Sequence, residues 1–140
     1  MATFNKFNSF TEEVAEGGHV LGTDVLKVAL TNTAPVAADT TWNVTAHPAP
    51  AAANGYTAGG NTPAITSSAQ TAGVYKLVLA DTVFTATAGG IGPFRYAVLY
   101  NFTKTAKGLG WYDYGSSITL ADAETLTVDF DGTNGVLTLT

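Results

Sequence analysis

Short runs in which apolar and polar residues alternate fill the chain from Asp24 to its end. In the first of them, DVLKVALT, Leu26, Val28 and Leu30 share one face. Successive side chains of a β-strand point to opposite faces of a sheet, so this period of two residues indicates a strand. Glycine, asparagine, aspartate or serine separates the runs and marks turns. The chain is therefore expected to form antiparallel strands joined by turns.

These runs predict an all-β fold. Closely spaced strands with one apolar face are typical of two packed antiparallel sheets or a closed barrel. The length of 140 residues is enough for one domain with its own core. We therefore expect a single domain over residues 1–140, an antiparallel β-sandwich or jelly roll of about eight strands. The expected strands cover residues 24–31, 64–67, 74–80, 82–87, 93–101, 108–114, 117–120, 124–130 and 136–140.

One short helix is expected near the start of the chain. The sequence SFTE at residues 9–12 matches a capping box, and the glycines at 17–18 would end the helix. Its apolar stripe could either cover an open end of the core or bind a partner. The helix and the residues before it form a predicted N-terminal arm over residues 1–22. The apolar positions at helical spacing are Phe7, Phe10 and Val14.

A second predicted arm is the long Ala/Pro-rich segment at residues 32–60, which holds three of the five prolines. Loops of this length are uncommon in compact domains and are usually functional, disordered or ordered against a neighbour. Trp42 and Tyr56 argue against simple disorder, because large aromatic side chains are usually buried.

The segment FRYAVLYN at residues 94–101 predicts a strand that is apolar on both faces. Strict alternation would place Phe94 and Tyr96 on the same face. Apolarity on both faces requires a second covering layer, which could be another subunit or a partner. Arg95 would then either pair with a carboxylate or mark the rim of an interface, and pairing is favoured because an unpaired buried charge is costly.

The C-terminal sequence VDFDGTNGVLTLT allows two interpretations, a calcium loop or a β-hairpin. An EF-hand loop needs glycine at its sixth position and a bidentate glutamate at its twelfth. Counting from Asp129, these positions hold Asn134 and Thr140, so the ligand pattern fails. Asn-Gly between two alternating runs is a strong hairpin signal, and the hairpin is therefore favoured.

Charge and composition narrow the possible partners. Only 12% of the residues are charged and the net charge is -5, so the basic surface of a nucleic-acid-binding protein is missing. There is no cysteine for a disulfide or a thiolate site. Neither a signal peptide nor an apolar run long enough to span a bilayer is visible, so we expect a soluble protein without membrane contact. A weakly charged surface suits packing against other proteins.

No group of residues in the sequence has the pattern of a known catalytic site. His19 and His47 lie in loop sequences without a recognisable nucleophile motif, and loop packing or solvent exposure is the favoured interpretation of both. The segment WYDY at residues 111–114 could stack a sugar beside Asp122 and Glu124, but an ordinary strand and turn explain it better. We therefore expect no enzyme activity, no catalytic residues, no bound metal and no cofactor.

Several segments resemble the head decoration, or cement, proteins of tailed bacteriophages. The resemblance is carried by FNKFNSFTEEVAE, LGTDVLKVALTNTAP, NGYTAGG, YKLVLAD, GPFRYAVLYN, GWYDYGSSITL and NGVLTLT, which together span nearly the whole chain. It implies a jelly-roll-like domain on the exterior of a virion capsid that bridges copies of the major capsid protein. It also implies a homo-oligomer, either a dimer or a trimer.

The resemblance leads to a hypothesis about contacts. We expect residues 1–8 and 32–60 to contact neighbouring subunits, and deletion of residues 1–8 to release the protein from shells while its β-rich spectrum is kept. The competing hypothesis is a carbohydrate- or receptor-binding module of a phage tail. The expected contact residues are Phe4, Phe7, Phe10, Trp42, Tyr56 and Arg95.

Overall fold

The computed structural model of the chain describes residues 2–140, and its fold is all-β, as expected. Every pair of neighbouring strands is antiparallel. Besides the helix α1 (Ser9–Ala15), the described residues form β1 (Thr3–Lys6), β2 (Leu26–Thr31), β3 (Ile65–Thr71), β4 (Val74–Leu79), β5 (Thr82–Thr85), β6 (Ile91–Asn101), β7 (Lys107–Leu120), β8 (Thr125–Val128) and β9 (Leu137–Leu139).

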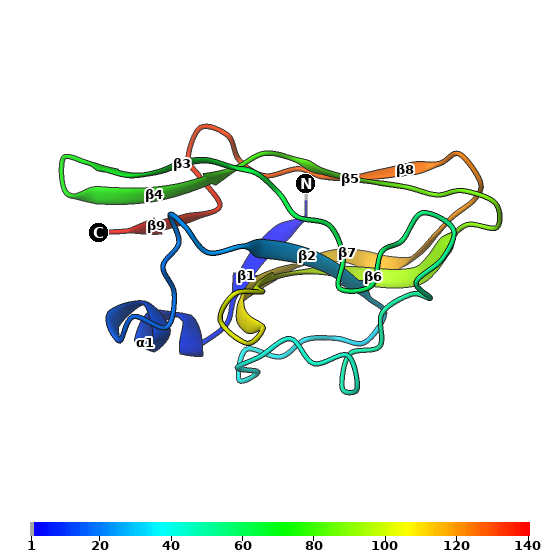
Figure 1. Ribbon diagram of the computed structural model, residues 1–140, viewed down its shortest axis with the longest axis horizontal. Helices are drawn as coiled ribbons and strands as arrows, with labels where there is room; N and C mark the ends of the chain where they lie inside the picture. Colours follow the sequence, from blue (N-terminus) through cyan, green and yellow to red (C-terminus); the bar gives the residue numbers. More distant parts are fainter. Residues whose placement is uncertain (1) are drawn as a thin grey trace.

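The strands lie in two layers, as Figure 1 shows. One layer is a four-stranded sheet in the order β1-β7-β6-β2. The other contains two smaller sheets, β3-β4-β9 and β5-β8. The main core fills the space between the layers, because the apolar face of each strand is turned toward the opposite layer. Its fully buried side chains include Leu30, Leu77, Phe84, Phe94, Leu99, Leu109 and Val128.

The alternation along β6 is interrupted by a shift of register. Phe94 pairs with Ile118, whereas Tyr96 pairs with Asp113. The irregularity between them turns Phe94 into the main core beside Leu99. The prediction that Phe94 and Tyr96 share one face was therefore wrong, since a bulge changes which face a side chain reaches.

The two strands predicted at 108–114 and 117–120 are one strand, β7. The long strand β6 pairs with both halves, from Ile91 opposite Leu120 to Asn101 opposite Lys107. A continuous partner keeps the two halves in one ladder, although the glycine and serines between them resemble a turn in the sequence.

The outer face of the four-stranded sheet is covered by the chain's own residues 32–60. Figure 1 shows the first part of this segment (cyan) below the sheet, on the side away from the other layer. Trp42 stacks on Tyr100 with ring centroids 6.1 Å apart, and its backbone N–H donates to the Ala106 carbonyl at 2.7 Å. The second layer expected from β6 is therefore supplied by the same chain, and the arm is ordered without a neighbour.

The predicted C-terminal hairpin was wrong. β8 pairs with β5 and β9 pairs with β4, so the two strands belong to different sheets. Phe130 is buried in the main core, and its backbone N–H donates to the Asp81 carboxylate at 2.9 Å. The Asp131 carboxylate accepts hydrogen bonds from Asn134 at 2.7 and 2.8 Å. The predicted turn at Asn134-Gly135 therefore exists. It does not close a hairpin, because burial of Phe130 leads the chain from the sheet of β8 to the sheet of β9.

Helix α1 covers one end of the core. Phe10 is fully buried in the main core and Val14 packs against it, which agrees with the interpretation as a cover. The capping box was wrong: Asn8 is the N-cap, it makes no side-chain hydrogen bond, and the Ser9 hydroxyl is buried without a partner. Among residues 2–140, no helix has the length and apolarity that crossing a membrane requires.

Candidate functional site

Four of the six expected contact residues are buried inside the chain. Phe10 and Tyr56 belong to the main core, while Phe7 and Trp42 belong to a second cluster on the outer face of the four-stranded sheet. The Tyr56 hydroxyl also accepts a hydrogen bond from the Leu30 backbone N–H at 3.1 Å. These four side chains therefore pack within the chain's own fold and present little surface to a partner in this conformation.

Phe4 and Arg95 remain accessible and both contact β7. The Phe4 ring lies 5.2 Å from the Tyr112 ring. Arg95 makes a two-pronged ion pair with Asp113, with Nε and Nη2 at 2.7 and 2.9 Å from the two carboxylate oxygens. The expected pairing of Arg95 is thus confirmed. The guanidinium hydrogen bond holds the pKa of Asp113 below its ordinary value.

The N-terminal residues are part of the sheet and do not form a free arm. Strand β1 pairs with β7 from Thr3 opposite Asp113 to Lys6 opposite Gly110. Phe7 then packs its ring 4.8 Å from that of Trp111. Deletion of residues 1–8 would remove an edge strand and a buried ring, so the expected release with an unaltered fold does not follow.

Both histidines pack within loops, which confirms that alternative for each. The buried His19 has its Nδ1 atom 3.1 Å from the Asn101 side-chain nitrogen, which also donates to Asp24 at 2.7 Å. Burial lowers the pKa of His19. The ring of His47 stacks on Trp42 at 5.8 Å. Within residues 2–140, no three histidine, aspartate or glutamate side chains are grouped so that they could hold a metal ion.

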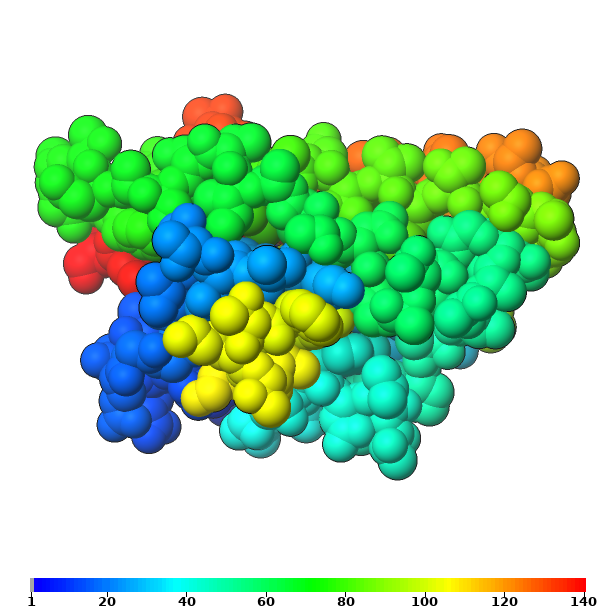
Figure 2. All heavy atoms as spheres, in the orientation of Figure 1, coloured from blue at the N-terminus to red at the C-terminus, as the bar shows by residue number. Residues whose placement is uncertain are grey.

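One surface region combines several exposed apolar side chains, and we call Val20, Val25 and Phe102 the apolar patch. Their exposed fractions are 47%, 43% and 55%. The Phe102 N–H donates to the Val25 carbonyl at 2.8 Å, and Asp24 N–H donates to the Val20 carbonyl at 2.9 Å. In Figure 2 the β6–β7 connection (yellow) protrudes beside the segment that leads into β2 (blue). Exposed apolar side chains gathered in this way are typical of protein contact sites.

Lys27 borders the apolar patch. Its ammonium lies 4.3 Å from the centroid of the Phe102 ring, within the range of a cation–π contact. The charge therefore holds the ring in place from one side and leaves its other side exposed.

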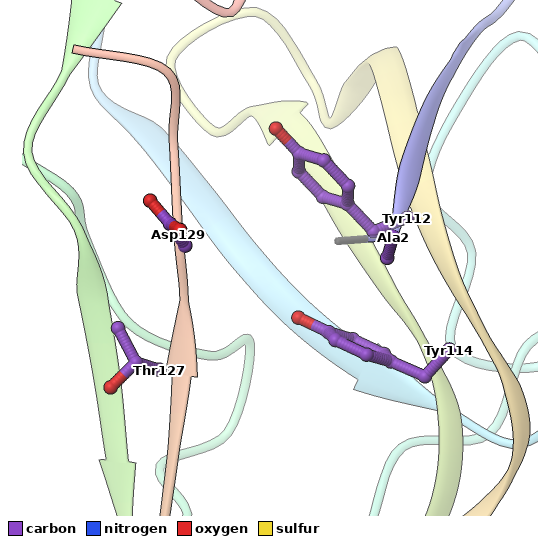
Figure 3. A pocket seen from close by; sticks show the side chains of 5 residues that line it. All are labelled: Ala2, Tyr112, Tyr114, Thr127 and Asp129. Carbon is purple, nitrogen blue, oxygen red and sulfur yellow. The ribbon is translucent and has the colours of Figure 1, made fainter.

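A second candidate is a pocket between β7 and the end of β8, together with the residue that follows β8. We call it the tyrosine pocket: it has a volume of about 360 Å³ and is lined by Ala2, Tyr112, Tyr114, Thr127 and Asp129. Figure 3 shows the two tyrosine side chains on β7, on the side that faces the chain segment carrying Thr127 and Asp129. A neighbouring hollow of about 460 Å³ shares Ala2 and Tyr114 with it.

Burial and nearby acidic residues affect the two tyrosines of the pocket. Burial raises the pKa of Tyr112 to about 12 and that of Tyr114 to about 12, and the nearby Asp129 carboxylate contributes to both increases. Asp131 and Asp81 contribute further to the increase for Tyr112. Both hydroxyls are therefore protonated at neutral pH, as those of unperturbed tyrosines also are.

Sequence reasoning considered parts of this pocket for other roles. Asp129 was the first position of the rejected calcium loop, and WYDY was weighed as a sugar-stacking segment around Trp111. The structure instead packs Trp111 against Phe7 and turns Tyr112 and Tyr114 toward Asp129. The period of two places the tyrosines on one face, but nothing in the sequence places β8 opposite that face.

Comparison of the chain with models of known protein families, with curated proteins and with solved structures finds no match.

Proposed function

We propose that this protein is a structural virion protein that binds the outer surface of a phage capsid and cements neighbouring major capsid protein subunits. The observation that carries this proposal is the apolar patch. Three exposed apolar side chains on turns of a β-fold suit a protein partner, because burying them against it is favourable. We further propose that the working form is a dimer or trimer without a catalytic role.

The arrangement of layers supports a β-sandwich of the jelly-roll type. In Figure 1, β4 leads directly into β5, and β8 and β9 lie beside them in the same layer. Read this way, the second layer consists of β3, the joined β4 and β5, and the joined β8 and β9, packed on the four-stranded sheet. The chain itself covers both sheet faces, which leaves turns and edges for partners.

Shell binding by a patch variant tests the proposal. Phe102→Asp should reduce occupancy on purified empty capsids at least about tenfold, since a buried phenylalanine side chain contributes roughly 1.5–3 kcal/mol. Val83→Asp is the matched control, because Val83 is also exposed, at 49%, but lies on β5 in the other layer. Occupancy is measured by co-sedimentation and by cryo-microscopy of the particles. Equal occupancy of the two variants would contradict the proposal.

The second candidate, a carbohydrate- or receptor-binding module of a phage tail, is favoured by the tyrosine pocket. Three hydroxyls and a carboxylate around one cavity could hydrogen-bond to a sugar. Saturable quenching of tyrosine fluorescence by a sugar, lost in Tyr114→Phe, would support this candidate.

A further inference from the structure

A cluster of three buried polar side chains, His19, Asp24 and Asn101, lies beneath the apolar patch. None of the three is more than 6% exposed. The Asp24 carboxylate accepts hydrogen bonds from the Val20 backbone N–H and from the Asn101 side-chain N–H, each at 2.7 Å. The Asn101 side-chain oxygen accepts a hydrogen bond from the Lys104 backbone N–H at 3.1 Å. Asn101 therefore joins the segment before β2 to the turn after β6.

The apolar patch and the polar cluster belong to the same two backbone segments. Each patch residue directly follows one cluster residue in the chain, in the pairs His19-Val20, Asp24-Val25 and Asn101-Phe102. The cluster residues are buried and the patch residues are exposed. The Val25 backbone N–H also donates to the Thr103 hydroxyl at 2.8 Å. A change in the hydrogen bonds of the cluster therefore acts directly on the backbone that carries the patch.

The hydrogen bonds of Asn101 determine which ring nitrogen of His19 carries the proton. A carboxylate only accepts hydrogen bonds, so the Asn101 atom that faces Asp24 is the amide nitrogen, a donor. The same nitrogen lies 3.1 Å from His19 Nδ1, which must therefore be an acceptor. His19 is thus neutral with its proton on Nε2, an atom that is buried without a hydrogen-bond partner among residues 2–140.

A second proton on the His19 ring is incompatible with this arrangement. The proton would lie on Nδ1 and face the Asn101 N–H, and two donors cannot form a hydrogen bond. Asn101 cannot reverse its amide, because its oxygen would then face the Asp24 carboxylate and its nitrogen the Lys104 N–H. Protonation therefore breaks the hydrogen bond between His19 and Asn101, which is a direct link between the two segments of the patch.

Burial and four charged groups act on the protonation of His19. Burial has the largest effect and lowers the pKa of His19 below its ordinary value of 6.5. Glu13 of α1 and Asp24 favour the protonated ring, whereas Lys104 of the β6–β7 turn and Lys107 of β7 oppose it. The ring is therefore neutral at neutral pH and gains a proton only in acid.

We propose that His19, Asp24 and Asn101 position the apolar patch and make its shape depend on protonation of His19. While His19 is neutral, the cluster holds the patch in one shape, and a preorganised surface loses less entropy on binding. When His19 gains a proton, its link to Asn101 is lost and the patch loses that shape. Attachment through the patch should therefore weaken in acid, a consequence that rests on the proposed function.

Nuclear magnetic resonance tests the positioning role without any partner. The backbone amides of Val20, Val25 and Phe102 are followed with the His19 ring from neutral pH downward. We expect the patch amides to shift with the same midpoint as the His19 ring, while the amide of Val83, exposed on β5, stays unchanged. Patch amides that stay still while His19 titrates would overturn the proposal. A His19 ring that remains neutral until the chain unfolds would overturn it as well.

Replacement of each histidine gives a matched comparison. His19→Gln has a side chain that is neutral at every pH, so the acid-dependent shifts of the patch should disappear. His47→Gln is the control and should keep them, because His47 is also buried but packs against Trp42. Circular dichroism checks that both variants fold, and the wild-type titration decides alone if His19→Gln does not. Shifts that persist in His19→Gln would refute the role of His19.

Shell binding shows whether this support acts in the proposed function. At the pH where half of His19 is protonated, the apparent affinity of the wild-type chain for purified capsids should fall about twofold, because only the binding-competent fraction attaches. His19→Gln should keep its affinity, which controls for any effect of acid on the shell. An equal fall in both proteins, or no fall in the wild type, would overturn the effect on attachment and leave the cement function standing. If the wild-type chain binds no shell at either pH, the proposed function fails, and a shared titration of His19 and the patch still supports the positioning role.

Discussion

Trp42 and Tyr56 show what single residues reveal about a long loop. Their size indicates that residues 32–60 are ordered, and both are buried. The sequence does not say which surface they contact, because an aromatic ring packs equally well on its own chain or on a neighbour. Trp42 lies on the outer face of the four-stranded sheet and Tyr56 enters the main core, so the two rings fix the loop to its own domain.

Trp42→Ala should therefore destabilise the whole domain. Removal of a buried tryptophan ring costs about 3–5 kcal/mol, and here it also uncovers Tyr100. Val44→Ala in the same loop is the control and should change the free energy of unfolding by less than about 0.5 kcal/mol, because Val44 is exposed. Urea unfolding followed by circular dichroism measures both. A loss below about 1 kcal/mol for Trp42→Ala would show that the loop is not held by this ring.

His19 predicts a dependence of stability on pH. Burial lowers its pKa in the folded chain below the ordinary value of 6.5, so the unfolded chain binds the proton more readily. Its contribution to stability is full above pH 6.5 and is lost as the pH falls below that value toward the folded pKa. Thermal unfolding between pH 7.5 and about 5 should show the decline, and His19→Gln should flatten it. An identical slope in both proteins would contradict the assignment.

The strands were predictable as elements, but their pairing was not. Alternation located β2, β4, β5 and β6 close to their observed bounds. It missed the continuity of β7 and the bulge in β6, since both depend on the partner strand. The Asn-Gly signal before β9 correctly indicated a turn, but local signals cannot show that the flanking strands join different sheets.

Gly60 lies where the loop over residues 32–60 meets β2, so a substitution there tests how tightly the loop is held against the sheet. Asn61 and Val28 exchange two backbone hydrogen bonds, at 2.8 and 3.0 Å, which close the long loop against the sheet. Gly60 has φ +82°, and a Cβ atom there would overlap the Val28 carbonyl.

Gly73 in the β3–β4 turn provides the matched control for Gly60, because it also has φ +82° but a Cβ atom there would meet nothing within 4 Å. Gly73→Ala should cost about 1 kcal/mol of unfolding free energy from backbone strain alone. Gly60→Ala should cost about 3 kcal/mol or more, since the overlap is added. Chemical denaturation measures the loss of unfolding free energy in each variant. Equal losses would show that the loop moves away from Val28 at no cost.

For the molecule as a whole, the all-β class was predictable and the candidate sites were not. The apolar patch joins a turn after β6 to residues before β2, and the tyrosine pocket joins β7 to the end of β8 and the residue after it. Each site depends on which strands become neighbours, which is decided by burial of the whole core. Phe7, Phe10, Trp42 and Tyr56, four of the expected contact aromatics, lie inside for the same reason.

The loop over residues 32–60 shields the sheet from within the same polypeptide. This face of the sheet therefore needs no second chain to keep water away from its apolar side chains. If the proposed cement function holds, the chain could fold completely before it meets a shell and attach afterwards. Timing of attachment would then be governed by the receiving surface and not by the folding of the incoming molecule.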